Sequence, residues 1–494
     1  MNFIKKLGYH YDFKVCLRAV LEVVAVVLFY SIGCILSQSN NFMAFFWMFI
    51  ACIVSFLYYA ILSKNLLDLR AILYGSITGA VALCQLRLSQ IQVVWETKTW
   101  VLLATALCFF SLGYSFVAMF KPNSPNCEKE VESKKIFFKK FTFKFNPKKV
   151  YYTTIFLAVM PIILFCIQVA IKGFIPIFVQ RYDAYMLFYT RLSIFINLVM
   201  FSAPLAFWCL KNMDLKRGQR ILMYAIIPLP TIIFQLMVQR GLFVWSICIL
   251  LVVVYLQSKR KFLGVTLVVG LLIFGIVFSS AMRAIPAEAM REIWQMDDTI
   301  VLSPDSDSQE EDDDTDNEEG KPQKNPSITI KIPDFAYAPY YYIVSGMENF
   351  NHMVTNLEDN AWGLRQLTPF TVILRFPALK ELIAEYPDFR ILPNSTNCLI
   401  SDFYYDFGIV GVIVEMFLLG ILSAIVQFFA KQKNNLFAIL EYGVLLSVLL
   451  TAFFAAWISV FGTWLFAGTA FLVFLYTYFS LVKNKRDKKE EIDG

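Results

Sequence analysis

Long apolar runs separated by short charged gaps fill most of this chain, and one polar stretch of about 120 residues interrupts them. A helix needs roughly 20 apolar residues to cross a bilayer, and lipid favours helices over open strands as spanning structures. The chain has about twelve such runs: 15–37, 42–63, 71–87, 99–120, 151–171, 192–210, 221–238, 242–257, 262–280, 404–430, 436–457 and 461–482. The seventh and eighth are the weakest, because Pro228 and Pro230 interrupt the seventh and only Gln239-Arg240-Gly241 separates the two. We therefore predict an all-α polytopic integral membrane protein. With 58% hydrophobic and 17% charged residues, the composition excludes an ordinary soluble protein.

Positive charge gathers in segments that twelve spans place on one side of the membrane. Nine lysines lie between Lys121 and Lys149, and other basic clusters follow at 211–220, 259–261, 431–433 and 483–489. Because cytoplasmic loops carry an excess of Lys and Arg, we expect both termini in the cytoplasm. Anionic lipid accounts for the basic loop, so membrane lipids are expected partners and nucleic acid is not.

This topology divides the chain into four parts. Residues 1–280 hold helices one to nine, with the cytoplasmic basic loop 121–149 and a short outer loop at 172–190. Residues 281–403 form one large extracytoplasmic loop, 404–482 hold helices ten to twelve, and 483–494 form a cytoplasmic tail. Within the large loop, 303–325 is acidic and free of aromatic residues, which predicts a disordered insert. It lacks the glycine-defined ligand spacing of a calcium loop.

Arginines on the expected outer side run against the usual charge bias of membrane proteins. Guanidinium groups stay charged and bind phosphate oxygens bidentately, so an anionic ligand at the outer face would account for them. Pairing with nearby acids, such as Arg181 with Asp183, is the alternative. Four border the membrane and are candidates for a phosphate site: Arg181, Arg191, Arg240 and Arg283. Arg291, Arg365, Arg375 and Arg390 follow in the large loop.

Few residues are candidates for acid–base chemistry. His352 lies in an aromatic-rich stretch that is expected to be helical, and a histidine titrates near neutral pH. Asp402 and Asp406 are four apart where the chain re-enters the membrane, and capping of the helix start by Asp406 is the structural alternative. Glu415 is an acid within a span. The cysteines show no metal-binding spacing, and we expect no metal and no cofactor.

Four segments carry a resemblance to a known family. The exit from the large loop reads NSTNCLISDFYYDFGIVG (394–411), a polar Asn/Thr stretch followed by an aromatic helix start with an Asp-Phe-Gly-x-x-Gly pattern. The others are KGFIPIF (172–178), VQRGLFVWSICILLVVVYL (238–256) and YYYIVSGMENFNHM (340–353). In this layout the chain resembles the bacterial oligosaccharide repeat-unit polymerases of the Wzy type.

The resemblance implies a membrane glycosyltransferase of the GT-C type in the bacterial inner (plasma) membrane. It would transfer a growing glycan from polyprenyl diphosphate to the next lipid-linked repeat unit, making O-antigen, capsule or exopolysaccharide. The partners implied are polyprenyl-diphosphate-linked oligosaccharides, a flippase and a chain-length regulator. The four arginines would bind the diphosphates, and His352, Asp402 or Asp406 would act as base or orient the acceptor.

Two other functions stay open. An O-antigen ligase-like transferase would share this architecture and use another acceptor. A non-enzymatic flippase or exporter of lipid-linked oligosaccharide would carry polar residues along the midplane of many helices, and many transporters contain internal repeats. In this chain the polar residues gather at the outer border instead.

Overall fold

The structure is a computed structural model of the chain. It describes residues 13–119, 145–179, 184–258, 299–302, 328–331, 334–374, 381–382, 387–391, 395–431 and 435–490, together with positions 266 and 270. The acidic insert 303–325, most of the basic loop 121–149 and most of the expected span 262–280 lie outside these residues. The fold class holds for the described part, which is helical apart from one pair of short strands.

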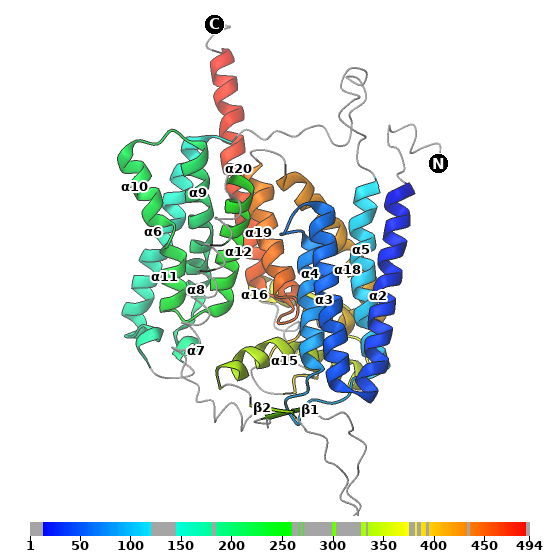
Figure 1. The fold of residues 1–494 in the computed structure, drawn as a ribbon. Coiled ribbons are helices and arrows are strands. Elements are labelled where there is room, and N and C mark those ends of the chain that lie inside the picture. Colours follow the sequence, from blue (N-terminus) through cyan, green and yellow to red (C-terminus); the bar gives the residue numbers. More distant parts are fainter. Residues whose placement is uncertain are drawn as a thin grey trace, which may run out of the picture.

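Helices that run along a common direction form a bundle (Figure 1). On one side of Figure 1, helices α2, α3, α4 and α5 pack with α18; on the other side α6 and α8 to α12 pack together, and α19 and α20 lie between. The first group comprises α2 (Phe13–Ser39), α3 (Asn41–Ser63), α4 (Leu69–Cys84), α5 (Thr97–Met119) and α18 (Leu399–Ala430). The second comprises α6 (Pro147–Lys172), α8 (Arg191–Ile196), η3 (Asn197–Phe201), α9 (Ser202–Asn212), α10 (Arg217–Ile226), α11 (Leu229–Leu236) and α12 (Arg240–Gln257). Between them lie α19 (Leu436–Leu450), η4 (Trp457–Ser459) and α20 (Phe461–Glu490).

Eleven of the twelve expected spans correspond to described helices. Within the described residues, nine helical stretches are long and apolar enough to cross a membrane, and α4 and α19 are shorter apolar helices of 16 and 15 residues. The break expected in the seventh run is present, because α10 ends at Ile226 and α11 begins only at Leu229, with Pro228 between them. The chain is therefore a multi-pass membrane protein by the length and composition of its helices, while the total of twelve spans remains a prediction.

The polar stretch contributes elements at one end of the bundle. Helix α15 (Asp334–Asn356) lies across this end, and strands β1 (Thr299–Leu302) and β2 (Ile328–Lys331) pair antiparallel next to it (Figure 1). The start of α2 and the end of α20 lie at the opposite end. Short elements η2 (Pro176–Phe178) and α7 (Ala184–Phe188) fall in the outer loop 172–190, and α16 (Leu364–Leu374) follows α15.

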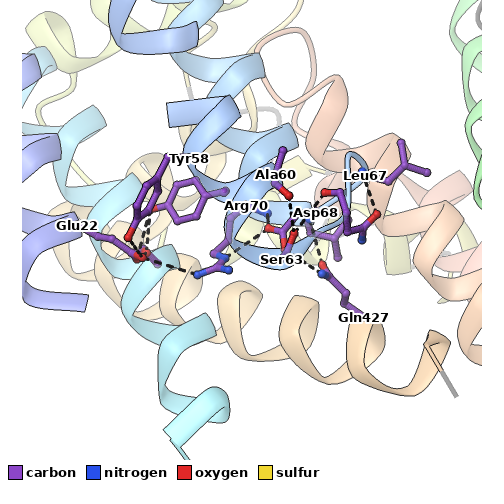
Figure 2. A network of polar contacts seen from close by, with 12 residues as sticks. Glu22, Tyr58, Ala60, Ser63, Leu67, Asp68, Arg70 and Gln427 are labelled. Carbon is purple, nitrogen blue, oxygen red and sulfur yellow. Dashed lines mark hydrogen bonds and ion pairs between the residues drawn. The ribbon is translucent and has the colours of Figure 1, made fainter. Parts of the chain in front are cut away.

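A buried polar network ties four helices together inside the bundle (Figure 2). Glu22 of α2 accepts a hydrogen bond from Ser111 of α5 at 2.7 Å and lies 3.9 Å from the Arg70 guanidinium of α4. Arg70 in turn lies 3.4 Å from Asp68, whose other oxygen accepts a bond from Gln427 of α18 at 2.9 Å. Because charges in lipid need partners, these contacts satisfy one another. The network fixes how α18 sits against α2, α4 and α5.

Candidate active site

Helix α18 is interrupted near its start, and the interruption follows two buried aspartates. Phe407 (φ −137°) and Gly408 (φ +60°, ψ −146°) leave the helical conformation. The Gly408 conformation is one that side chains with a Cβ rarely adopt. Asp402 and Asp406 lie on the short segment before this point, with exposed fractions of 7% and 0%. The span expected to begin at 404 thus begins at Leu399 and includes both acids.

Asp406 fixes the start of α16. Its two carboxylate oxygens accept hydrogen bonds from the backbone N–H groups of Arg365 and Gln366, each at 3.0 Å. Its own carbonyl accepts a bond from the N–H of Trp362 at 2.9 Å. From the sequence, Asp406 was a candidate cap for the start of its own helix. In the structure its carboxylate instead caps the first turn of the neighbouring helix α16. Because both oxygens are occupied, the geometry favours positioning over proton transfer for this residue.

This arrangement places Arg365 within electrostatic range of Asp402, and no ion pair within 4 Å joins the two side chains in the described part of the chain. Its guanidinium carbon lies 4.7 Å from the centroid of the Tyr405 ring, and its charge acts favourably on the Asp402 carboxylate. The neighbouring Gln366 side chain donates a hydrogen bond to Glu415, beyond the interruption of α18. Helix α16 is therefore attached to α18 on both sides of Gly408.

Arg240 approaches the same region from α12. It is the first residue of that helix, and its guanidinium carbon lies 5.7 Å from the centroid of the Tyr342 ring of α15. The positive end of the helix dipole adds to its charge. Arg240 is only partly buried, so an anion can reach it.

The short helix η4 connects the start of α12 with Asp402. The Trp457 ring lies 3.7 Å from the position that a Cβ on Gly241 would take. Two residues later, the Ser459 side chain lies beside the Asp402 carboxyl group. Helix η4 thus lies between the first turn of α12, which carries Arg240, and the buried Asp402.

Several buried polar atoms around η4 lack a hydrogen-bond partner within the described part of the chain. They are Gln239 Oε1 before α12, Trp457 Nε1 in η4, Thr463 Oγ1 in α20 and Asn397 Oδ1 before α18. Buried polar groups are nearly always paired with protein or water, and leaving one unpaired costs about 1–3 kcal/mol. Such a group of atoms indicates a place where a polar ligand or water is accommodated.

His352 stands apart from the aspartates. It is exposed on α15, and its Nδ1 lies 3.1 Å from the carbonyl oxygen of Phe389. The Phe389 ring separates it from Tyr405, with centroid distances of 6.3 and 5.5 Å to the two rings. No contact among the described residues joins His352 to Asp402 or Asp406.

Helix α15 is fixed to the bundle by a buried acid. Glu348 accepts hydrogen bonds from Gln92 at 2.8 Å and from the Trp95 indole at 2.9 Å, both in the loop between α4 and α5. Burial raises the pKa of Glu348 to about 7, although both hydrogen bonds and the nearby Arg87 act to lower it. The apolar side of α15 is also buried, with Met347 and Phe350 fully enclosed. The aromatic stretch is a helix, as expected, and it packs against protein.

The arginines predicted from the sequence differ in their exposure and in their contacts. Arg191 is exposed at the start of α8, and no contact within the described residues joins it to Arg240 or to the aspartates. Arg390 pairs with Asp388 through its Nε, at 2.8 Å, and this pairing lowers the pKa of Asp388. The other predicted arginines lie outside the described residues: Arg181, Arg283, Arg291 and Arg375.

Sequence reasoning missed the place of Arg365 and the part played by η4. Arg365 had no motif around it, and its approach to Asp402 depends on the Asp406 contact 41 residues away. Trp457 was expected to be the last residue of the span 436–457, and Ser459 lies in the short gap before the span 461–482. The signal that was available is the Asp-Phe-Gly-x-x-Gly pattern, whose glycine marks the interruption.

Comparison with protein families bears directly on this region. Residues 341–453 match the family of putative O-antigen polymerases. The matched segment includes α16, α18, α19 and most of α15, and so contains Arg365, Asp402 and Asp406. The match confirms the resemblance seen in the sequence. No curated protein and no solved structure matches the chain.

Proposed function

We propose that the protein polymerises lipid-linked oligosaccharide repeat units at the outer face of the bacterial inner (plasma) membrane. The observation that carries the proposal is the location of the family match in the structure. The family match covers the segment in which Asp406 binds the start of α16 and so holds Arg365 within electrostatic range of Asp402. In this proposal the protein is a membrane glycosyltransferase of the GT-C type.

The chemistry is a displacement at an anomeric carbon. A sugar hydroxyl of one lipid-linked repeat unit forms a new C–O bond to the anomeric carbon of the growing glycan. The bond from that carbon to the diphosphate oxygen breaks, and polyprenyl diphosphate leaves with the electron pair. The proton of the attacking hydroxyl passes to a carboxylate.

The described residues support a division of roles. Arg240 and Arg365 stabilise the charge on the departing diphosphate, since pre-positioned cations act strongly where charge develops. Asp402 accepts the proton, because it is the carboxylate beside both Arg365 and Ser459. Asp406 positions α16. His352 is exposed and has no described contact with Asp402 or Asp406. In this proposal it therefore orients the acceptor sugar and does not take part in the proton transfer.

The other arginines remain candidates for a second, outer set of phosphate contacts. Arg191 is exposed and accessible, and Arg181 and Arg283 border the same expected outer face. A polymerase binds two lipid diphosphates, one on the donor and one on the acceptor, so more than two cations have a use. A flippase and a chain-length regulator are the partners that this function implies.

The direct test supplies the purified, reconstituted chain with lipid-linked repeat units alone. A ladder of products that differ by one repeat supports the polymerase. Transfer onto lipid A core without a ladder would indicate a ligase. Movement of the lipid across vesicles with neither product would indicate a flippase, and either of the last two results overturns the proposal.

A further inference from the structure

Helices α18, α19 and α20 enclose a groove of about 560 Å³. Its lining is almost entirely apolar, with Val426 and Phe429 from α18, Leu445 and Val448 from α19, and Ala467 and Phe474 from α20. The groove follows α19 from Asn435 to Val448, a rise of about 20 Å along a helix. That length is more than half of the roughly 30 Å hydrocarbon core of a bilayer.

The groove is open on the side of the lipid. Leu422 and Trp464 both line it, and their exposed fractions are 48% and 47%. An apolar molecule in the membrane can therefore enter sideways. The volume of the groove falls within the range of sites for single small molecules. A helix about 10 Å in diameter would not fit along the groove.

One end of the groove meets the candidate active site. Ile458, Thr463 and Trp464 line this end, and Ile458 is next in sequence to Ser459, which lies beside Asp402. Phe370 of α16 contacts Trp464, with 6.0 Å between ring centroids. Thr463 also carries one of the buried hydroxyls without a described partner. The apolar groove therefore ends beside η4 and α16, the elements next to the candidate active site.

We infer that this groove holds the polyisoprenyl chain of the lipid-linked substrate while its diphosphate lies at Arg365 and Arg240. The inference rests on the proposed function for the identity of the lipid. A molecule with an anionic head and a long apolar tail fits a groove that has cationic side chains beyond one end and is apolar apart from Asn435, Glu441 and Thr463. A phospholipid acyl chain shares the apolar character, and the experiment below separates the two sources.

The test fills the groove without touching the polar site. Ala467→Phe adds a ring to the lining, whereas Gly468→Phe adds the same ring at the next position, where a Cβ would meet nothing within 4 Å. Binding of polyprenyl phosphate to the purified full-length variants is measured by native mass spectrometry, with a phosphatidylglycerol competitor. We expect Ala467→Phe to weaken binding about tenfold or more, Gly468→Phe to bind like the unaltered chain, and phosphatidylglycerol not to compete.

Equal binding by the two variants would overturn the inference, as would full displacement by phosphatidylglycerol. A second measurement does not depend on how the variant folds: a photoactivatable polyprenyl phosphate is cross-linked to the unaltered chain and the labelled peptides are mapped. Labels within 419–474 are expected; labels confined to α2 or α3 would contradict it. If the groove binds the lipid but no sugar ladder forms, the proposed function fails while the groove stands.

Discussion

At the scale of single residues, the arginines differ in what surrounds them. Arg240 and Arg365 lie over the rings of Tyr342 and Tyr405, whereas Arg390 forms an exposed ion pair with Asp388. An exposed ion pair contributes little to stability and has no charge to offer a ligand. The number of outer arginines was informative, but their neighbours decide which can act on a substrate.

Replacement of Arg240 or Arg365 by Ala is expected to reduce polymerisation on the order of 10²–10³-fold, the usual loss when one charge-stabilising group is removed. Arg390→Ala is the matched control and is expected to keep its rate. The measurement is the initial rate of ladder formation by purified variants of equal thermal stability. Full activity of both Arg240→Ala and Arg365→Ala would exclude them from the diphosphate site.

At the scale of elements, the joint between α16 and α18 is the feature on which the site depends. Gly408 is held at φ +60° and ψ −146°, and its neighbour Asp406 binds the first turn of α16. Gly408→Ala is expected to cost about 1–3 kcal/mol of stability and to lower the apparent melting temperature in detergent. Gly218→Ala, at an open position in α10, should leave it nearly unchanged. Equal melting temperatures would show that the joint tolerates a Cβ.

The contact of Glu348 in α15 with the loop between α4 and α5 predicts a pH dependence of stability. The pKa of Glu348 is about 7 in the folded protein against 4.5 for the free side chain, so the folded state holds its proton more tightly. Stability from this group is therefore greatest below about pH 4.5 and falls as the pH rises to about 7, by up to about 3 kcal/mol. Melting temperatures of the unaltered chain and Glu348→Gln, compared from pH 4.5 to 8, should agree on the acid side, where both side chains are neutral, and diverge on the alkaline side, where the variant should melt at the higher temperature. A constant difference across this range would count against the raised pKa.

The sequence predicted the helices better than the contacts between them. Long apolar runs predicted eleven spans that correspond to described helices, and Pro228 marked the break between α10 and α11. Pairs close in sequence, such as Arg390 with Asp388, also obey local rules. The approach of Arg365 to Asp402 could not be predicted, because it depends on how α16 packs across α18. The same holds for η4, whose apolar letters resemble those of a span.

At the scale of the whole molecule, the positions of the helix ends fit the orientation that the lysine-rich segments predict. The start of α2 and the end of α20 lie opposite α15 (Figure 1), and the lysine-rich segments predict that the terminal side is cytoplasmic. A membrane-impermeant thiol reagent applied to intact cells should therefore label Glu358→Cys, just after α15, in a cysteine-free background. Asp214→Cys, between α9 and α10, should react only after lysis. The reverse labelling would invert the orientation.

The central claim is that Asp402 accepts the proton of the attacking sugar hydroxyl during glycan polymerisation. The most direct measurement follows ladder formation from lipid-linked repeat units by the reconstituted chain, Asp402→Asn and Asp388→Asn. The account predicts a ladder for the unaltered chain and for Asp388→Asn, and a loss on the order of 10²-fold or more for Asp402→Asn with its melting temperature retained. A ladder from Asp402→Asn at the unaltered rate would contradict the account.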